Sequence, residues 1–141
     1  MLFNQDPRQF QHWVVELAGE FSSKAWSNDR GIDGRIYFET SSGLRSMVLS
    51  VKGGKLKPDF TREVLGTTTR EANVDIGGLI CRLPPTRGMV HDAATAGMVS
   101  IGGKEYPRLQ IRTVADLLEG RGFDTPSHVR TLQWERQPSL L

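Results

Sequence analysis

Two runs of alternating apolar and polar residues, joined by a short polar segment, constrain the fold of this chain most. The first run is Gly31–Phe38, the second is Met47–Lys55, and Ser41-Ser42-Gly43-Leu44 lies between them. Alternation with period two is typical of half-buried strands, and the polar segment is a turn signal. The sequence therefore predicts a β-hairpin near its N-terminal third.

The predicted register of this hairpin brings a carboxylate and an ammonium group together. A two-residue loop at Ser42 and Gly43 would pair Asp33 with Lys52, with Cβ atoms roughly 5 Å apart. One face of the ribbon is apolar and would face the core: Ile36, Phe38, Met47, Leu49 and Val51. The other face carries Asp33, Arg35, Ser50 and Lys52. The Asp33–Lys52 pair is either an ordinary cross-strand ion pair or half of a metal-dependent phosphodiesterase site.

Composition limits the class of protein. A chain of 141 residues is long enough for one domain with a substantial core. Its formal net charge is only +2, so a nucleic-acid surface would require local clustering of basic residues. The single cysteine, Cys81, argues against a disulfide framework and a cysteine-rich zinc site. We expect a cytoplasmic protein without a membrane span, because no apolar stretch is long enough and no signal peptide is evident.

Caps, breakers and periodicity predict the remaining elements. Asp6-Pro7 starts a helix whose apolar stripe includes Phe10, Trp13 and Val14. Further elements are expected as follows: a helix over Pro58–Ala72, a strand over Ile76–Leu83, a helix over Thr86–Ala96, a strand over Pro107–Arg112 and a helix over Thr113–Gly120. A hairpin followed by β-α-β crossovers predicts an α/β fold with a mixed central sheet flanked by helices. We expect one domain over residues 1–125, and a tail or linker remnant over 126–141.

Several motifs together resemble one known group of proteins. Gly31-Ile-Asp33-Gly34 followed by Leu49-Ser50-Val51-Lys52-Gly53-Gly54 resembles the core of the PD-(D/E)xK nuclease superfamily. The likeness is greatest to Mrr-like restriction endonuclease domains, including the domain often appended to bacterial adenine-specific DNA methyltransferases. Three other segments share it: Phe10-Gln11-x-Trp13, Ala93-Ala94-x-Ala96-Gly97 and Tyr106-Pro107-Arg108-x-Gln110-Ile111.

This resemblance implies a restriction-endonuclease-like fold that cleaves double-stranded DNA with Mg²⁺ or Mn²⁺. It implies that Asp33 binds the metal, that Lys52 is the catalytic lysine, and that the backbone at Val51 adds a metal ligand. Such enzymes commonly act as homodimers so that both strands are cut. A methyltransferase is implied as a partner or a fused domain.

The chain departs from the superfamily pattern at Ser50. That position carries Asp or Glu in the superfamily generally and often Gln in Mrr-like members, and a hydroxyl is a poorer Mg²⁺ ligand than a carboxylate. We hypothesise that Glu16 of the first helix compensates, as an acidic residue of the catalytic site that binds the metal, with Glu20 as the alternative. A basic set that follows the lysine is expected to contact DNA phosphates: Lys55, Lys57, Arg62 and Arg70.

Three functions remain open on sequence alone. The first is a metal-dependent DNA endonuclease domain of a restriction or genome-defence system. The second is a DNA-binding module that keeps the nuclease fold without cleaving, which the hydroxyl of Ser50 favours. The third is an interaction module that serves a partner methyltransferase. Metal affinity distinguishes the nuclease from the inactive DNA-binding module, because only a catalytically active site should bind Mg²⁺ or Mn²⁺ through Asp33.

Overall fold

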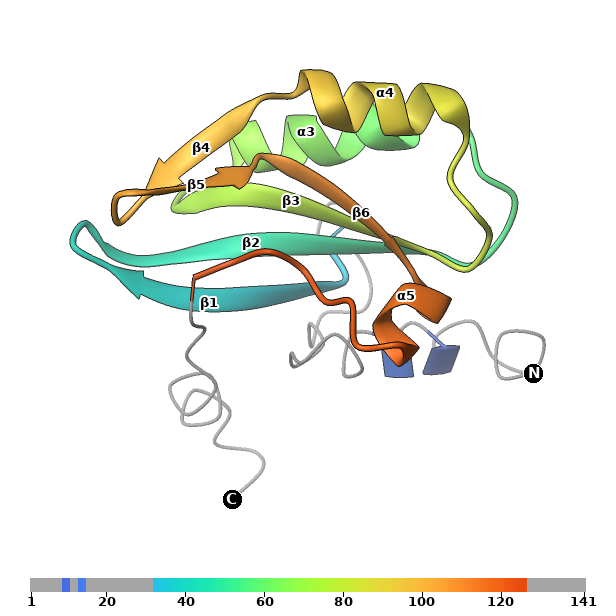
Figure 1. The fold of residues 1–141 in the computed structure, drawn as a ribbon, viewed down its shortest axis with the longest axis horizontal. Helices are drawn as coiled ribbons and strands as arrows, with labels where there is room; N and C mark the ends of the chain where they lie inside the picture. Colours follow the sequence, from blue (N-terminus) through green and yellow to red (C-terminus); the bar gives the residue numbers. More distant parts are fainter. Residues whose placement is uncertain (1–8, 11–12, 15–31, 127–141) are drawn as a thin grey trace.

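A mixed four-stranded sheet forms the centre of the molecule. The computed structural model describes residues 9–10, 13–14 and 32–126. The sheet contains β1 (Gly34–Thr40), β2 (Gly43–Lys52), β3 (Val74–Cys81) and β6 (Leu109–Thr113), in the spatial order β1-β2-β3-β6 (Figure 1). β1 runs antiparallel to β2, whereas β3 and β6 continue the sheet in parallel. The predicted mixed α/β sheet is therefore confirmed.

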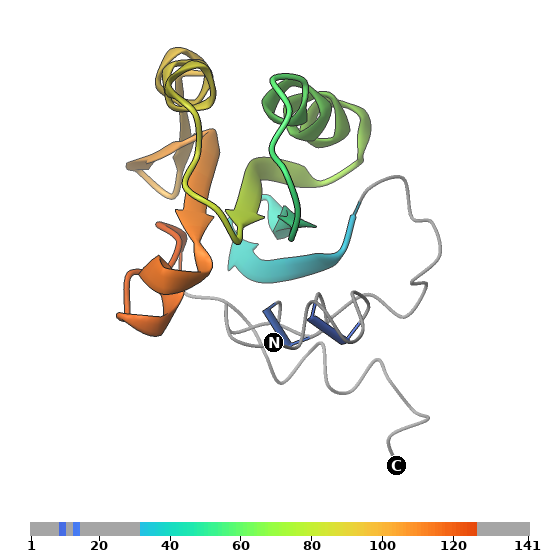
Figure 2. The same cartoon turned by 90° about the vertical axis from the view of Figure 1, so that its right-hand side faces the viewer.

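Helices cover both faces of this sheet. α3 (Phe60–Arg70) and α4 (Arg87–Thr95) lie side by side over one face, and α5 (Val114–Leu118) lies on the other side (Figure 2). The crossovers β2-α3-β3 and β3-α4-β6 proceed in the same direction across the sheet. Crossovers of the same hand must then place both helices on the same face.

Local capping signals fix the starts of two helices where the sequence predicts them. The Thr86 hydroxyl accepts a hydrogen bond from the Met89 amide at 3.2 Å and caps α4. Thr113 and Asp116 form a reciprocal capping box at the start of α5. Gly97 follows α4 with a φ of +88°, in the left-handed conformation that ends a helix.

The hairpin forms with a register different from the predicted one. Thr40 pairs with Gly43, so the loop residues are Ser41 and Ser42. The Thr40 hydroxyl donates to the Gly43 carbonyl at 2.8 Å and accepts from the Ser42 amide at 3.1 Å, which favours this turn. Arg35 consequently lies opposite Val48 rather than Ser50. A shift of two residues preserves which side chains share a face, so the predicted core face is still correct.

Most of the core consists of two clusters of buried side chains, one on each face of the sheet. Beneath the sheet, Phe10 and Val14 of the N-terminal helical residues pack with side chains of the strands and with Leu117: Ile36, Phe38, Met47, Leu49, Val51, Ile76 and Ile80. Above the sheet, a second cluster lies under α3 and α4: Val64, Leu79, Cys81, Met89 and Leu109. Trp13 was expected in the apolar stripe of the first helix, but 38% of it is exposed.

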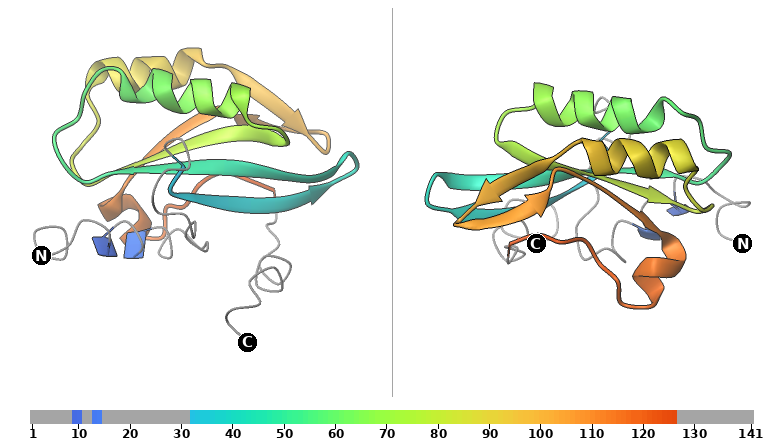
Figure 3. Two further views of the ribbon diagram at one scale, coloured as in Figure 1. Left: turned by 180° about the vertical axis from the view of Figure 1, so that it is seen from behind. Right: turned by 45° about the horizontal axis from the view of Figure 1, so that its top comes forward.

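Two strands were not predicted. β4 (Met98–Ile101) and β5 (Lys104–Pro107) form a separate two-stranded hairpin beyond α4 (Figure 3). Gly102 and Gly103 both have positive φ, as a two-residue hairpin turn requires. The strand expected over residues 107–112 is therefore divided, with β5 ending at Pro107 and β6 starting at Leu109.

The segment after α5 returns along the sheet. The Gln110 amide side chain donates to the Asp124 carbonyl and accepts from the Asp124 amide, both at 2.8 Å. Phe123 packs against the lower core. Because of these contacts, the chain belongs to the domain as far as Asp124. The expected domain boundary near residue 125 stays a prediction. None of the helices within the described ranges combines the length and apolarity needed to cross a membrane.

Candidate active site

Asp33 lies at the open end of the hairpin, next to the last residues of β2. Its amide donates to the Leu49 carbonyl at 2.8 Å, which extends the β1–β2 ladder by one residue and places Asp33 opposite Ser50. Its carboxylate Oδ2 accepts a hydrogen bond from the Val51 amide at 2.7 Å. The predicted direct pairing of Asp33 with Lys52 is thus wrong by two residues, although both side chains belong to the same end of the ribbon.

The Val51 backbone faces Asp33. The N–H and C=O of one residue in a strand point to the same neighbour, and the Val51 amide reaches Asp33. The next carbonyl along, that of Lys52, accepts from the Arg82 amide at 3.0 Å on the opposite side of β2. The Val51 carbonyl is therefore directed to the side where Asp33 lies, as expected for a backbone metal ligand.

Lys52 ends β2 and places its ammonium group under α3. Its Nζ lies 4.3 Å from the centroid of the Phe60 ring, a cation–π contact that holds the side chain over the strand end. Among the described residues, no carboxylate forms an ion pair with Lys52. Its positive charge offsets part of the rise that burial causes in the pKa of Asp33, so the two groups interact through space.

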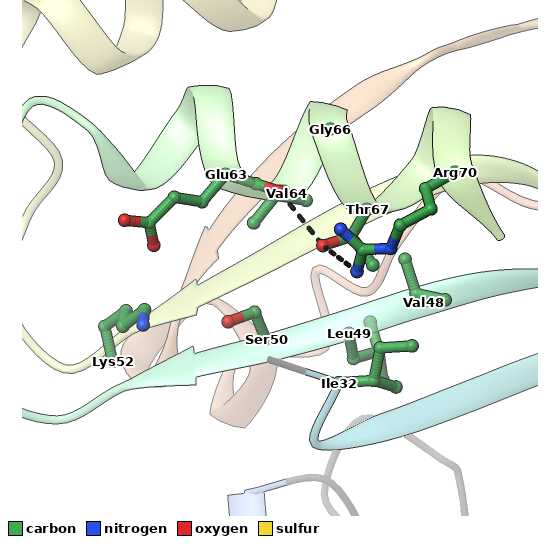
Figure 4. A pocket seen from close by; sticks show the side chains of 10 residues that line it. All are labelled: Ile32, Val48, Leu49, Ser50, Lys52, Glu63, Val64, Gly66, Thr67 and Arg70. Carbon is green, nitrogen blue, oxygen red and sulfur yellow. Dashed lines mark hydrogen bonds between the residues drawn. The ribbon is translucent and has the colours of Figure 1, made fainter. Parts of the chain in front are cut away.

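Ser50 and Lys52 line a cavity between β2 and α3. The cavity has a volume of about 420 Å³, an apolar floor and a polar rim (Figure 4). Its apolar lining comes from Ile32, Val48 and Leu49 on the side of the sheet and from Val64 on α3. Its polar lining is formed by Ser50, Lys52, Glu63, Thr67 and Arg70. Ser50 is only 7% exposed. None of the residues that the structure describes hydrogen-bonds to its hydroxyl group.

Burial dominates the electrostatics of Asp33. Desolvation raises the pKa of this carboxyl group above its usual value, against the opposing effects of the Val51 amide and of Lys52. A cation beside a poorly solvated carboxylate stabilises its ionised form more than it would stabilise an exposed carboxylate. This environment is typical of a functional carboxylate at the edge of a cavity.

The raised pKa of Asp33 predicts how stability depends on pH. The folded protein holds this proton more tightly than the unfolded chain, so stability is lost as pH rises from about 3.8 through the raised pKa. Asp33→Asn keeps an acceptor for the Val51 amide and removes the charge. We expect the variant to gain free energy of unfolding relative to wild type from acidic to neutral pH, in urea titrations. Wild type gaining on the variant over that range would contradict a raised pKa.

Cys81 lies beside Lys52 in the neighbouring strand but is not a reactive group. The β2–β3 register places the two residues opposite each other. Burial raises the pKa of the Cys81 thiol to about 11, although Lys52 lowers it in part. The thiol therefore stays protonated at neutral pH, and it serves as a small core residue.

Of the four basic residues predicted to contact DNA, three lie beside this strand end and one does not. Lys55 and Lys57 are exposed in the connection between β2 and α3. Arg62 forms an ion pair with Asp59 at 2.9 Å, but both side chains are largely exposed, so the pair is weak and exchangeable. Arg70 lies at the far end of the cavity, where it contacts the Thr67 hydroxyl at 3.4 Å.

The hypothesis that Glu16 or Glu20 replaces the acid absent at position 50 stays a prediction. Glu63 was not among the predicted site residues. Glu16 and Glu20 lie outside the described residues. Glu63, in the first turn of α3, lines the cavity together with Ser50 and Lys52. Its position in a helix that follows directly after the strand of Lys52 was the available signal, but the rotation of that helix over the sheet depends on tertiary packing.

The donor atoms at this site fit a Mg²⁺ ion that is completed by substrate. Among the residues that the structure describes, no group of three His, Cys, Asp or Glu side chains is close enough to hold a metal. Mg²⁺ in phosphoryl-transfer sites is commonly held by one or two carboxylates plus phosphate oxygens and water. The Asp33 carboxylate and the Val51 carbonyl supply oxygen ligands of that kind.

Comparisons with known proteins give one structural likeness. No protein-family profile matches the chain, and no curated protein sequence matches it. The structure is similar to that of the restriction endonuclease MspJI in complex with a 27-mer oligonucleotide, with a TM-score of 0.47 and 15% sequence identity. The likeness covers 82% of this chain and 28% of the other, so the chain spans less than a third of that protein's length.

Proposed function

We propose that this chain is a Mg²⁺-dependent DNA endonuclease domain of a restriction or genome-defence system. One observation carries the proposal: a half-buried carboxylate, a backbone carbonyl on the same side of β2 and a lysine meet where β2 ends. Asp33, Val51 and Lys52 come from adjacent strands, and the cavity beneath α3 opens beside them. The motif resemblance of the same three residues supports this assignment.

The residues divide the work of phosphodiester hydrolysis between them. A bound Mg²⁺ ion would neutralise phosphate charge and lower the pKa of a water molecule. The Asp33 carboxylate and the Val51 carbonyl would hold that ion. Lys52 has only donor hydrogens, so its ammonium group would bind the scissile phosphate or orient the attacking water. Phe60 restrains Lys52 and thereby reduces the entropy lost when the substrate binds.

A calorimetric titration with Mn²⁺ separates this function from that of an inactive DNA-binding module. Wild type should bind Mn²⁺, and Asp33→Asn should lose that binding while keeping its fold. A wild-type protein that binds DNA but no Mn²⁺ would favour the second function instead. A protein that binds neither would favour an interaction module, for which a methyltransferase is the partner to test.

The exposed lysines after β2 should contribute contacts that are independent of DNA sequence. We expect Lys55→Ala and Lys57→Ala to weaken DNA binding, each lowering the slope of log affinity against log salt by about 0.9. Lys104→Ala is the matched control, because the β4–β5 turn lies at the opposite end of the sheet from the end of β2 (Figure 1). Fluorescence anisotropy at several salt concentrations measures the slope, and an unchanged slope would exclude both lysines from the DNA surface.

A single active site must cut the two strands of a duplex one after the other, whereas two active sites can cut both strands in one binding event. A homodimer of this chain would provide them, as in other symmetric assemblies. Sedimentation in the presence of a duplex would reveal two copies per DNA molecule. Sedimentation of single copies would instead predict nicking as the main reaction.

A further inference from the structure

The cavity between β2 and α3 has the size and the lining of a pocket for a small organic group. Its volume of about 420 Å³ lies within the range of roughly 300–1,000 Å³ that is usual for ligand pockets. Aliphatic side chains and a few polar groups line it together, which is the common composition of such pockets. The lining therefore suits a ligand that has apolar faces and a polar edge.

Ser50 directs an unpartnered hydroxyl group into this cavity. The residue is only 7% exposed, and no hydrogen bond to its hydroxyl comes from the described part of the chain. Figure 4 shows its side chain among those that line the cavity. Buried polar groups normally have a partner, and a hydroxyl group can both donate and accept a hydrogen bond. The hydroxyl of Ser50 is therefore available to a polar group of a ligand.

The remaining lining favours a planar ring flanked by negative charge. Aliphatic side chains line the cavity from two sides, with Ile32 and Val48 on the sheet and Val64 on α3. Such walls can contact both faces of a flat ring. Lys52 lies at one end of the cavity and Arg70 at the other (Figure 4). Because cations attract phosphate groups, this arrangement matches the chemistry of one nucleotide within a nucleic-acid strand.

The cavity adjoins the candidate active site. Ile32 directly precedes Asp33, and Ser50 directly precedes Val51. Lys52 belongs both to the cavity lining and to the candidate site. Since successive residues of a strand are about 3.3 Å apart, the cavity begins beside the groups proposed to hold the scissile phosphate. A nucleotide next to that phosphate can enter the cavity only when its base has left the stack.

We propose that this cavity binds one unstacked nucleotide of a DNA strand, adjacent to the scissile phosphate. The base would lie between the aliphatic walls, and the Ser50 hydroxyl would hydrogen-bond its polar edge. This inference rests on the proposed nuclease function and specifies its substrate as DNA with an unpaired nucleotide at the cleavage site. Proteins that bind an extruded base hold it between apolar or aromatic side chains, and the energetic cost is least when the base is already unpaired.

DNA binding in EDTA tests the inference independently of metal and of cleavage. Two duplexes of one sequence are compared by fluorescence anisotropy, one fully paired and one with a single unpaired 2-aminopurine nucleotide. We expect wild type to bind the second duplex at least about tenfold more tightly, because no base pair must be opened. Stacking quenches the emission of 2-aminopurine, so this emission should rise on binding.

Ser50→Ala tests the role of the hydroxyl group without adding volume. It should reduce the preference for the unpaired nucleotide about fivefold, the effect of one lost hydrogen bond. Ser46→Ala is the matched control, because Ser46 is a buried serine of the same strand that lies outside this cavity lining. The Ser46 hydroxyl already donates to the Asn73 carbonyl at 3.3 Å. The preference of this variant should equal that of wild type.

Equal affinity of wild type for the two duplexes would overturn the inference and leave the proposed nuclease function standing. The same result, together with saturable binding of deoxyadenosine monophosphate, would assign the cavity to a free nucleotide instead. A wild-type preference in Ser50→Ala would also overturn the inference. Absence of binding to either duplex would remove the inference and the proposed function together.

Discussion

Lys52→Met should lower the rate of Mg²⁺-dependent DNA cleavage by about 10²- to 10³-fold, the loss typical when a preorganised donor to developing charge is removed. Methionine retains the unbranched apolar stem that contacts Phe60, so the fold should be preserved. Only the ammonium group is lost. Single-turnover cleavage of supercoiled plasmid at saturating enzyme measures the effect without a contribution from DNA affinity.

Lys57→Met is the control for this prediction. It removes an equal charge from the neighbouring connection, at an exposed position outside the cavity lining. We expect it to weaken DNA binding while leaving the single-turnover rate unchanged. Cleavage by Lys52→Met at the wild-type rate would show that the lysine is a surface charge with no part in the reaction.

Gly77→Val should destabilise the protein by about 3 kcal/mol, at the upper end of the usual cost of overpacking a core. A Cβ atom at this position in β3 would lie 2.4 Å from the Thr68 Oγ1 atom and 2.8 Å from a Val64 methyl group. Both neighbours are β-branched and stiff at χ1. The Thr68 hydroxyl is also fixed by a hydrogen bond to the Val64 carbonyl at 2.8 Å. The helix itself would have to move away from the sheet.

Gly66→Ala on α3 is the matched control, because a Cβ atom there meets nothing within 4 Å beyond the backbone of its own helix. Alanine in a helix interior is expected to stabilise by roughly 0.5–1 kcal/mol relative to glycine. Equilibrium unfolding in urea compares the two variants with wild type. A midpoint for Gly77→Val equal to that of wild type would contradict the close packing of α3 on β3, and with it the position of Glu63.

Much of the fold follows from local signals in the sequence. The period-two pattern of the hairpin predicted which side chains face the core, because a shift by two residues does not exchange the faces. Thr86 and Thr113 predicted two helix starts, because a capping hydroxyl acts within one turn of its own position. The mixed sheet follows from a hairpin succeeded by two crossovers.

The hairpin loop and the buried face of α3 depend on side-chain interactions that the hydrophobic pattern of the sequence does not reveal. The segment Ser41-Ser42-Gly43 allows two adjacent loops, and the Thr40 side chain selects between them. Thr61 and Thr67 of α3 are buried, although threonine is a polar residue that is more often exposed. Thr61 donates to Asp92 of α4 at 2.7 Å, and Thr67 donates to the Glu63 carbonyl at 3.0 Å.

The same effect explains why the site was predicted only in part. Asp33, Lys52 and Val51 lie on two neighbouring strands, so their proximity follows from the hairpin alone. Glu63 lines the cavity because the buried side of α3 is formed by Val64 together with three threonines, and these residues set the rotation of the helix over the sheet. That rotation depends on tertiary packing. It cannot be predicted from hydrophobic periodicity when the inner face of the helix carries polar residues such as threonine.

The most direct test of the central claim is the incubation of supercoiled plasmid, methylated and unmethylated, with the wild-type protein in Mg²⁺ or in EDTA. The account predicts nicked or linear products in Mg²⁺ alone, with none from Asp33→Asn. The contrast between the two plasmids would then reveal which methylation state the nuclease acts on. If the protein binds the plasmid but leaves it intact in Mg²⁺ as well as in EDTA, the result would contradict a metal-dependent active site at Asp33 and Lys52.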